Sequence, residues 1–152
     1  MVRLRFLAPA AALAACWAAP VQATCAPLSV FFDWNSTQLS EESQAALERL
    51  AVTVAWKGPD LAHVLLTSHT DTSGTPRANR QMALRRARAV REVLLAYQVP
   101  PELIAIQAVG EAAPRVVTAR NVREPRNRRV ELLIQMSADA QARQLENGQP
   151  IC

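Results

Sequence analysis

The sequence has few of the side chains from which catalytic and metal sites are built. Its only histidines, His63 and His69, do not have the spacing of a zinc-binding HExxH motif. Of its three cysteines, Cys25 and Cys152 lie near opposite ends of the chain. These residues form neither a Ser-His-Asp triad nor a zinc site in any obvious pattern. We therefore expect no catalytic centre, no metal and no cofactor.

Long apolar runs are also scarce. A membrane-spanning helix needs roughly 20 apolar residues, whereas the longest run, residues 6–17, is interrupted by Pro9. Two arginines precede this run and small residues follow it at 20–23, which predicts a secretion signal over residues 1–23. The alternative is a lipoprotein signal over residues 1–15, because the sequence LAAC at 13–16 resembles a lipobox that would be lipidated at Cys16. In either case we expect no transmembrane helix in the mature chain.

Export would place the remaining cysteines in an oxidising compartment, where two thiols in one domain are candidates for a bridge. We predict a Cys25–Cys152 disulfide. The alternative is two unpaired cysteines.

Lysine occurs only at position 57, while twelve of the sixteen arginines lie in residues 77–91 and 115–129. Without the two arginines of the signal, the formal net charge falls from +4 to +2. The planar guanidinium fork suits carboxylates and phosphates. Aromatic residues, 5% of the chain, are not interleaved with these arginines. This pattern, together with the export signal, argues against nucleic acid as a partner.

The remaining sequence predicts one domain over residues 24–136. Strands are expected at 28–32, 61–68, 103–109 and 127–136 from their short apolar or alternating runs. Helices are expected from the Ser40 cap to about residue 57 and from Thr75-Pro76 to about Tyr97. Residues 110–126 are expected to be a loop, and residues 137–152 a polar tail closed by Cys152. The order β-α-β-α-β-β predicts an α/β (α+β) two-layer sandwich with helices packed on a mixed sheet.

One arginine of the second predicted helix faces the wrong way for a surface residue. At 100° per residue, Arg86 falls in the middle of the apolar stripe, whereas five other arginines of the helix lie outside it. A buried guanidinium is costly unless it is paired, so a carboxylate of the protein or of a ligand should be near. The nearest candidate in sequence is Asp71. Helix geometry leaves two readings open, a structural Asp71–Arg86 ion pair and a ligand site.

Several motifs in order resemble those of the OmpA C-terminal-like family. Residues 68–74 (SHTDTSG), Asn79 and residues 82–87 (MALRRA) are similar to the family pattern GHTDxxG…NxxLSxxRA. Residues 110–114 (GEAAP) are similar to GxGExxP, residues 127–131 (NRRVE) match NRRVE, and residues 31–33 (FFD) resemble the opening strand. The resemblance covers residues 28–135. The chain departs from the pattern at Ser68, Ala83, Ala108 and the Arg77-Ala78 pair.

The resemblance implies non-catalytic binding of peptidoglycan through the meso-diaminopimelate of its stem peptide, which would anchor or organise the cell envelope. Asp71 and Arg86 are then the main contacts, and the groove is lined by Asn79, Thr70, Phe32 and Asp33. For Phe32 the alternative is core packing, and for Asp33 and Asn79 it is loop capping. For Arg128 and Arg129 a salt bridge with Glu131 or Asp33 is expected.

This function predicts a periplasmic location, with outer-membrane association and a lipid anchor if Cys16 is acylated, and it allows envelope proteins as partners. Two alternative functions are a hydrolase acting on the cell wall and a basic module that binds an anionic polymer.

Overall fold

The structure is a computed structural model, and it describes residues 27–147. The predicted signal peptide, the alternative lipidation at Cys16 and the Cys25–Cys152 disulfide lie outside the described residues and stay predictions. Within residues 27–147, none of the helices combines the length and the apolar character needed to cross a membrane.

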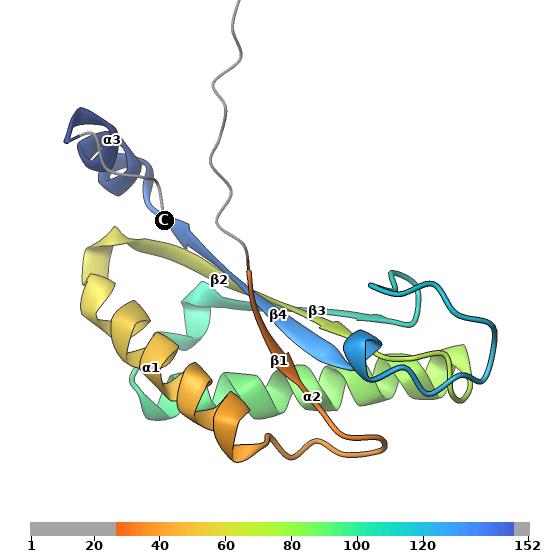
Figure 1. The fold of residues 1–152 in the computed structure, drawn as a ribbon. Helices are drawn as coiled ribbons and strands as arrows, with labels where there is room; N and C mark the ends of the chain where they lie inside the picture. The colour runs from red at the N-terminus through yellow and green to blue at the C-terminus, as the bar shows by residue number, and fades with distance from the viewer. Residues whose placement is uncertain (1–26, 148–152) are drawn as a thin grey trace, which may run out of the picture.

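A four-stranded mixed sheet forms one layer of the domain (Figure 1). Its strands are β1 (Leu28–Phe31), β2 (Leu61–His69), β3 (Ile104–Gly110) and β4 (Arg129–Met136). They lie in the order β1-β4-β2-β3, with β2 and β3 parallel and the other neighbours antiparallel. The short 3-10 helices η1 (Gly58–Asp60), η2 (Pro101–Leu103) and η3 (Pro125–Asn127) precede β2, β3 and β4.

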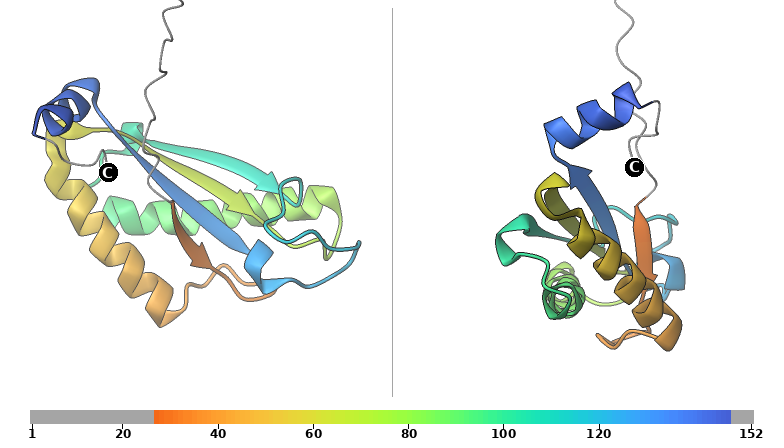
Figure 2. Two further views of the ribbon diagram at one scale, coloured as in Figure 1. Left: turned by 45° about the horizontal axis from the view of Figure 1, so that its top comes forward. Right: turned by 90° about the vertical axis from the view of Figure 1, so that its left-hand side faces the viewer.

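Two helices, α1 (Glu41–Lys57) and α2 (Pro76–Ala96), form the second layer and lie on the same face of the sheet (Figures 1 and 2). Both begin where the sequence predicted. The side chain of Ser40 accepts a hydrogen bond from the Ser43 amide, and that of Thr75 accepts one from the Ala78 amide. Each cap satisfies an amide that has no partner within its own helix.

The apolar core lies between the helices and the sheet. Its fully buried side chains come from both layers and include Val30, Leu47, Val54, Val64, Leu66, Val90, Leu94, Val130 and Leu132. The predicted fold class, order of elements and mixed sheet are therefore confirmed.

The prediction of a polar tail from Ser137 missed a third helix, α3 (Ala138–Glu146). Ser137 caps this helix and Arg143 forms an ion pair with Asp60, at the junction of α1 and β2. The start of the last strand was also misplaced. Asn127 belongs to η3 and β4 begins at Arg129, because the Asn127 side chain is hydrogen-bonded to the backbone of Val116 in the preceding loop.

Candidate functional site

The motif residues meet at the end of the sheet where β2 and β3 finish and α2 begins. The Thr70 amide donates to the carbonyl of Gly110 at 3.0 Å, which joins the two strand ends. Gly110 has a φ of 67°, and a Cβ at this position would lie 3.2 Å from the backbone nitrogen of Arg80. Glycine therefore permits both the positive φ and the close approach of β3 to the first turns of α2.

A cleft of about 250 Å³ opens at this point. It brings together Thr70, Asp71, Asn79 and Arg86, four of the six residues that the sequence indicated. Arg128 lies on its wall as well. The other lining residues come from the loops after β1 and β2 and from α2: Trp34, Asn35, Ser73, Gly74, Ala78, Met82 and Arg85.

The carboxylate of Asp71 is buried and held by three donors. Its Oδ1 accepts hydrogen bonds from the amide of Ser73 at 3.2 Å and from the hydroxyl of Ser73 at 2.5 Å. Its Oδ2 accepts one from Nη1 of Arg128 at 3.1 Å. A carboxylate can accept about four hydrogen bonds, so Asp71 can accept one more, at Oδ2, from a group in the cleft.

Arg86 is a buried cation, with only 1% of its surface exposed. Its Nε donates to the carbonyl of Ser36 at 3.0 Å and its Nη2 to the carbonyl of Asp33 at 2.9 Å. It forms no ion pair with any carboxylate of residues 27–147. Burial, assisted by the charge of Arg128, lowers the pKa of Arg86 to about 10, while Asp71 opposes the shift. The guanidinium is therefore charged at neutral pH, and three of its five N–H groups remain available to an anion.

The structure contradicts the Asp71–Arg86 ion pair, one of the two readings that the sequence left open, and confirms the salt bridge with Glu131 for Arg129 but not for Arg128. Asp71 and Arg86 line the same cleft but are not paired, because the partner of Asp71 is Arg128. Arg128 was expected to pair with Glu131 or Asp33, yet only Arg129 pairs with Glu131, with Nε and Oε1 2.7 Å apart. Arg128 shares the parity of the buried positions Val130 and Leu132, so strand alternation already pointed its side chain toward the helices.

Phe32 and Asp33 support the cleft through their backbone. Nε of Arg128 donates to the Phe32 carbonyl at 3.0 Å, and Arg86 binds the Asp33 carbonyl. The Phe32 ring is in the core, with its centroid 5.2 Å from Cζ of Arg86, a cation–π distance. The side chains of both residues line an adjoining pocket instead.

Three residues around the cleft, Ser73, Trp34 and Glu111, are not among the six predicted site residues. Ser73 holds Asp71, and Trp34 in turn donates from Nε1 to the hydroxyl of Ser73 at 3.1 Å. Glu111 accepts from Nδ2 of Asn79, which also donates to the Asp71 carbonyl at 3.3 Å. Glu111 lies within the GEAAP motif and Ser73 within SHTDTSG, so the motifs contained a signal for two of the three. Trp34 lies outside these motifs, and only its position after the first strand pointed to the cleft.

His69 precedes Thr70 and Asp71 in the sequence but does not line the cleft. Its side chain is buried at the end of β2, where Arg129 and Glu131 of β4 are its charged neighbours. Burial, and then the charge of Arg129, lower the pKa of His69, while Glu131 acts in the opposite direction.

This lowered pKa predicts a stability that falls in mild acid. As the pH drops below 6.5, the imidazole takes up a proton in the unfolded chain before it does so in the folded protein. The free energy of unfolding should therefore decrease from pH 7 downward until the pH reaches the lowered pKa. Urea denaturation between pH 7.5 and 5 should show a smaller decrease for His69→Gln than for the wild type. His63→Gln, which replaces an exposed histidine, is the control, and parallel curves for the wild type and His69→Gln would contradict the prediction.

Comparison with known proteins identifies relatives that share this arrangement of elements. The crystal structure of the peptidoglycan-associated lipoprotein from Burkholderia pseudomallei is 28% identical with a TM-score of 0.64, covering 70% of this chain and 89% of that one. The C-terminal domain of MotB from Helicobacter pylori is 26% identical with a TM-score of 0.60, covering 78% and 94%.

Curated relatives are longer proteins. An outer membrane protein of Gluconacetobacter diazotrophicus is 33% identical over 111 residues, which are 69% of this chain and 29% of that protein. Outer membrane protein A of Escherichia fergusonii is 31% identical over 85 residues, 56% of this chain and 35% of that protein. The chain thus spans about a third of these relatives. The model of the OmpA family matches residues 31–129, more than half of the chain, and this protein therefore belongs to the OmpA family.

Proposed function

We propose that this protein binds peptidoglycan without catalysis, through the meso-diaminopimelate of the stem peptide. Such binding would anchor or organise the cell envelope. The observation that carries the proposal is the buried guanidinium of Arg86, which has no protein counter-ion within residues 27–147 and lines the same cleft as the Asp71 carboxylate. This arrangement suits a ligand with a carboxylate for Arg86 and, close to it, a hydrogen-bond donor for Asp71.

The side chain of meso-diaminopimelate ends in one carbon that carries both an ammonium and a carboxylate. The carboxylate can accept two parallel hydrogen bonds from the available N–H groups of Arg86. The ammonium can donate to Oδ2 of Asp71, the oxygen that has one acceptor position left. Each charge-assisted hydrogen bond of this kind contributes about 1.5–3 kcal/mol when it is shielded from water.

The charge of the cleft favours the same ligand. Three arginines, Arg85, Arg86 and Arg128, line it with a single carboxylate, that of Asp71. A ligand that carried only an ammonium would add a fourth cation to this group, whereas a zwitterion brings its own anion. The name of the Burkholderia neighbour, a peptidoglycan-associated lipoprotein, and the names of the curated relatives, outer membrane proteins, support a site of action in the periplasm, at the outer membrane.

The test compares two stem peptides that differ at one group. The tripeptide L-Ala-γ-D-Glu-meso-diaminopimelate should bind in calorimetry or NMR titration. The same tripeptide with L-lysine in third place keeps the side-chain ammonium but lacks the side-chain carboxylate. It should bind at least about tenfold more weakly, the loss expected for one charge-assisted contact. Asp71→Asn, which keeps the side-chain shape but removes the charge, should weaken both peptides. Equal affinity for the two tripeptides, or binding of neither at millimolar concentration, would refute the proposal.

A further inference from the structure

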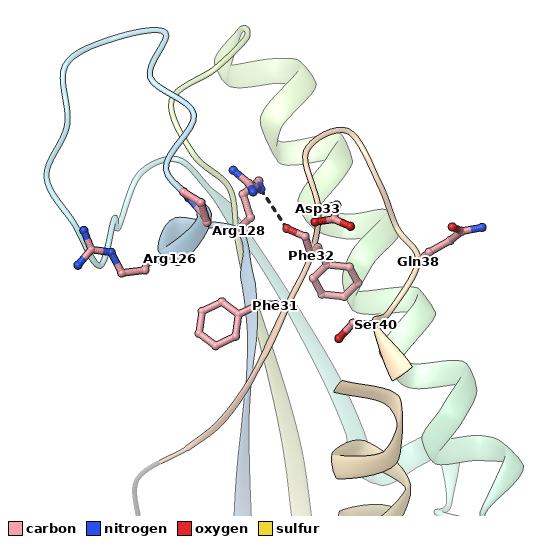
Figure 3. Close-up of a pocket in the computed structure, with 8 residues that line it drawn as sticks. Phe31, Phe32, Asp33, Gln38, Ser40, Arg126 and Arg128 are labelled. Carbon is pink, nitrogen blue, oxygen red and sulfur yellow. Dashed lines mark hydrogen bonds between the residues drawn. The ribbon is translucent and has the colours of Figure 1, made fainter. Parts of the chain in front are cut away.

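A second pocket adjoins the diaminopimelate cleft and has no role in the function proposed above. Its volume is about 400 Å³, larger than that of the cleft. Phe31 and Phe32 at the end of β1, Gln38 and Ser40 before α1, and Pro125 and Arg126 of η3 form its walls (Figure 3). Arg128 lines both the pocket and the cleft, so the two are separated by little more than one side chain.

The apolar part of the pocket includes an aromatic ring that is open to solvent. Phe31 is 39% exposed, whereas Phe32 next to it is buried in the core. In Figure 3 the two rings lie on either side of the chain at the end of β1. Pro125 adds a second exposed apolar surface. A ligand with an apolar face can therefore pack against Phe31 without any displacement of the core.

The polar part of the pocket favours an uncharged ligand rich in hydroxyl groups. Both of its guanidinium groups are already neutralised, Arg126 by Glu124 with Nε and Oε1 2.9 Å apart and Arg128 by Asp71 at 3.1 Å. The exposed carboxylate of Asp33 forms no ion pair or side-chain hydrogen bond within residues 27–147. It would repel an anion but can accept hydrogen bonds from hydroxyl groups.

We infer that this pocket binds a saccharide ring of the peptidoglycan backbone, an inference that rests on the proposed function. A pyranose has one face of C–H groups, which matches the Phe31 ring, and a rim of hydroxyl groups, which can donate hydrogen bonds to the carboxylate of Asp33. Two residues separate the sugar from diaminopimelate in the stem, so a chain of three residues spans about 10 Å when extended. Because Arg128 lines both the pocket and the cleft, a ligand that occupies the two together would pass over this one side chain.

The test uses the diaminopimelate tripeptide alone and the same tripeptide attached to its N-acetylglucosaminyl-N-acetylmuramyl disaccharide. The wild-type protein should bind the disaccharide form roughly tenfold more tightly, a difference of about 1.4 kcal/mol. Phe31→Ala should remove most of this advantage and leave the affinity for the free tripeptide unchanged. Phe31 points away from the core, so its replacement should not prevent folding. The control is Trp56→Ala, which removes a highly exposed aromatic residue outside the pocket and the cleft.

Equal affinity of the wild type for the two ligands, or an equal loss for both in Phe31→Ala, would overturn the inference. Glycan strands stripped of their stem peptides separate this inference from the proposed function. They should shift the NMR amide signals of Phe31 and Asp33 even if the tripeptide does not bind. Binding of the tripeptide without these glycan shifts would leave the proposed function intact and exclude the saccharide site.

Discussion

Asp71→Ala is expected to lower the free energy of unfolding by about 3–5 kcal/mol, because it leaves the buried guanidinium of Arg128 without its counter-ion. The side chains of Asp71 and Arg128 are only 4% and 9% exposed, so water compensates little for the lost carboxylate. Urea denaturation followed by circular dichroism measures the loss. A decrease below about 1 kcal/mol, the value typical of a surface ion pair, would contradict the buried pairing.

A double replacement separates the structural role of Asp71 from its role in binding. Asp71→Leu combined with Arg128→Met removes both charges and fills similar space, so part of the lost stability should return. The recovery is incomplete, because the Phe32 carbonyl still lacks the donor that Arg128 provides. This stable variant should nevertheless fail to bind the diaminopimelate tripeptide. Recovered stability together with recovered binding would show that the ligand does not use the Asp71 carboxylate.

Arg86→Lys should weaken binding of the diaminopimelate tripeptide by roughly 10- to 100-fold, the loss of one charge-assisted contact of about 1.5–3 kcal/mol. The substitution keeps the positive charge. An ammonium, however, lacks the planar fork that donates to the Ser36 and Asp33 carbonyls and at the same time to both oxygens of a carboxylate. Isothermal titration calorimetry checks the affinity.

The matched control is Arg85→Lys, since Arg85 lines the same cleft but is exposed to solvent. Its replacement should change the affinity less than about threefold, in keeping with the small contribution of solvent-exposed charges. Equal losses in the two variants would indicate that the ligand responds to the overall charge of the cleft and not to the geometry of Arg86.

The sequence predicted well those parts of the fold that depend on residues close together in the chain. The caps at Ser40 and Thr75 act within one turn of their helices, and both helices begin where expected. Helix α3 was missed because it has only nine residues, most of them polar, and buries only Ala140. Its ion pair between Arg143 and Asp60 links positions 83 residues apart, which no local pattern predicts.

The same distinction applies to the cleft. The inward direction of Arg86 follows from helical periodicity and was predicted. Its acceptors, the carbonyls of Asp33 and Ser36, are backbone atoms of a loop 53 and 50 residues away, and no side-chain pattern encodes their direction. The pairing of Asp71 with Arg128 depends on the position of β2 beside β4 in the sheet, which the order of elements alone left open.

The antiparallel pairing of β1 with β4 also determines how the domain would respond to mechanical tension. β1 runs from Leu28 toward the cleft, where the carbonyls that follow it hold Arg86 and Arg128. A pull applied between Leu28 and a ligand held in the cleft would act along the strand, at right angles to the hydrogen bonds that join β1 to β4. These bonds would share the load in shear instead of opening one after another, so β1 is oriented to transmit force between its start and the ligand.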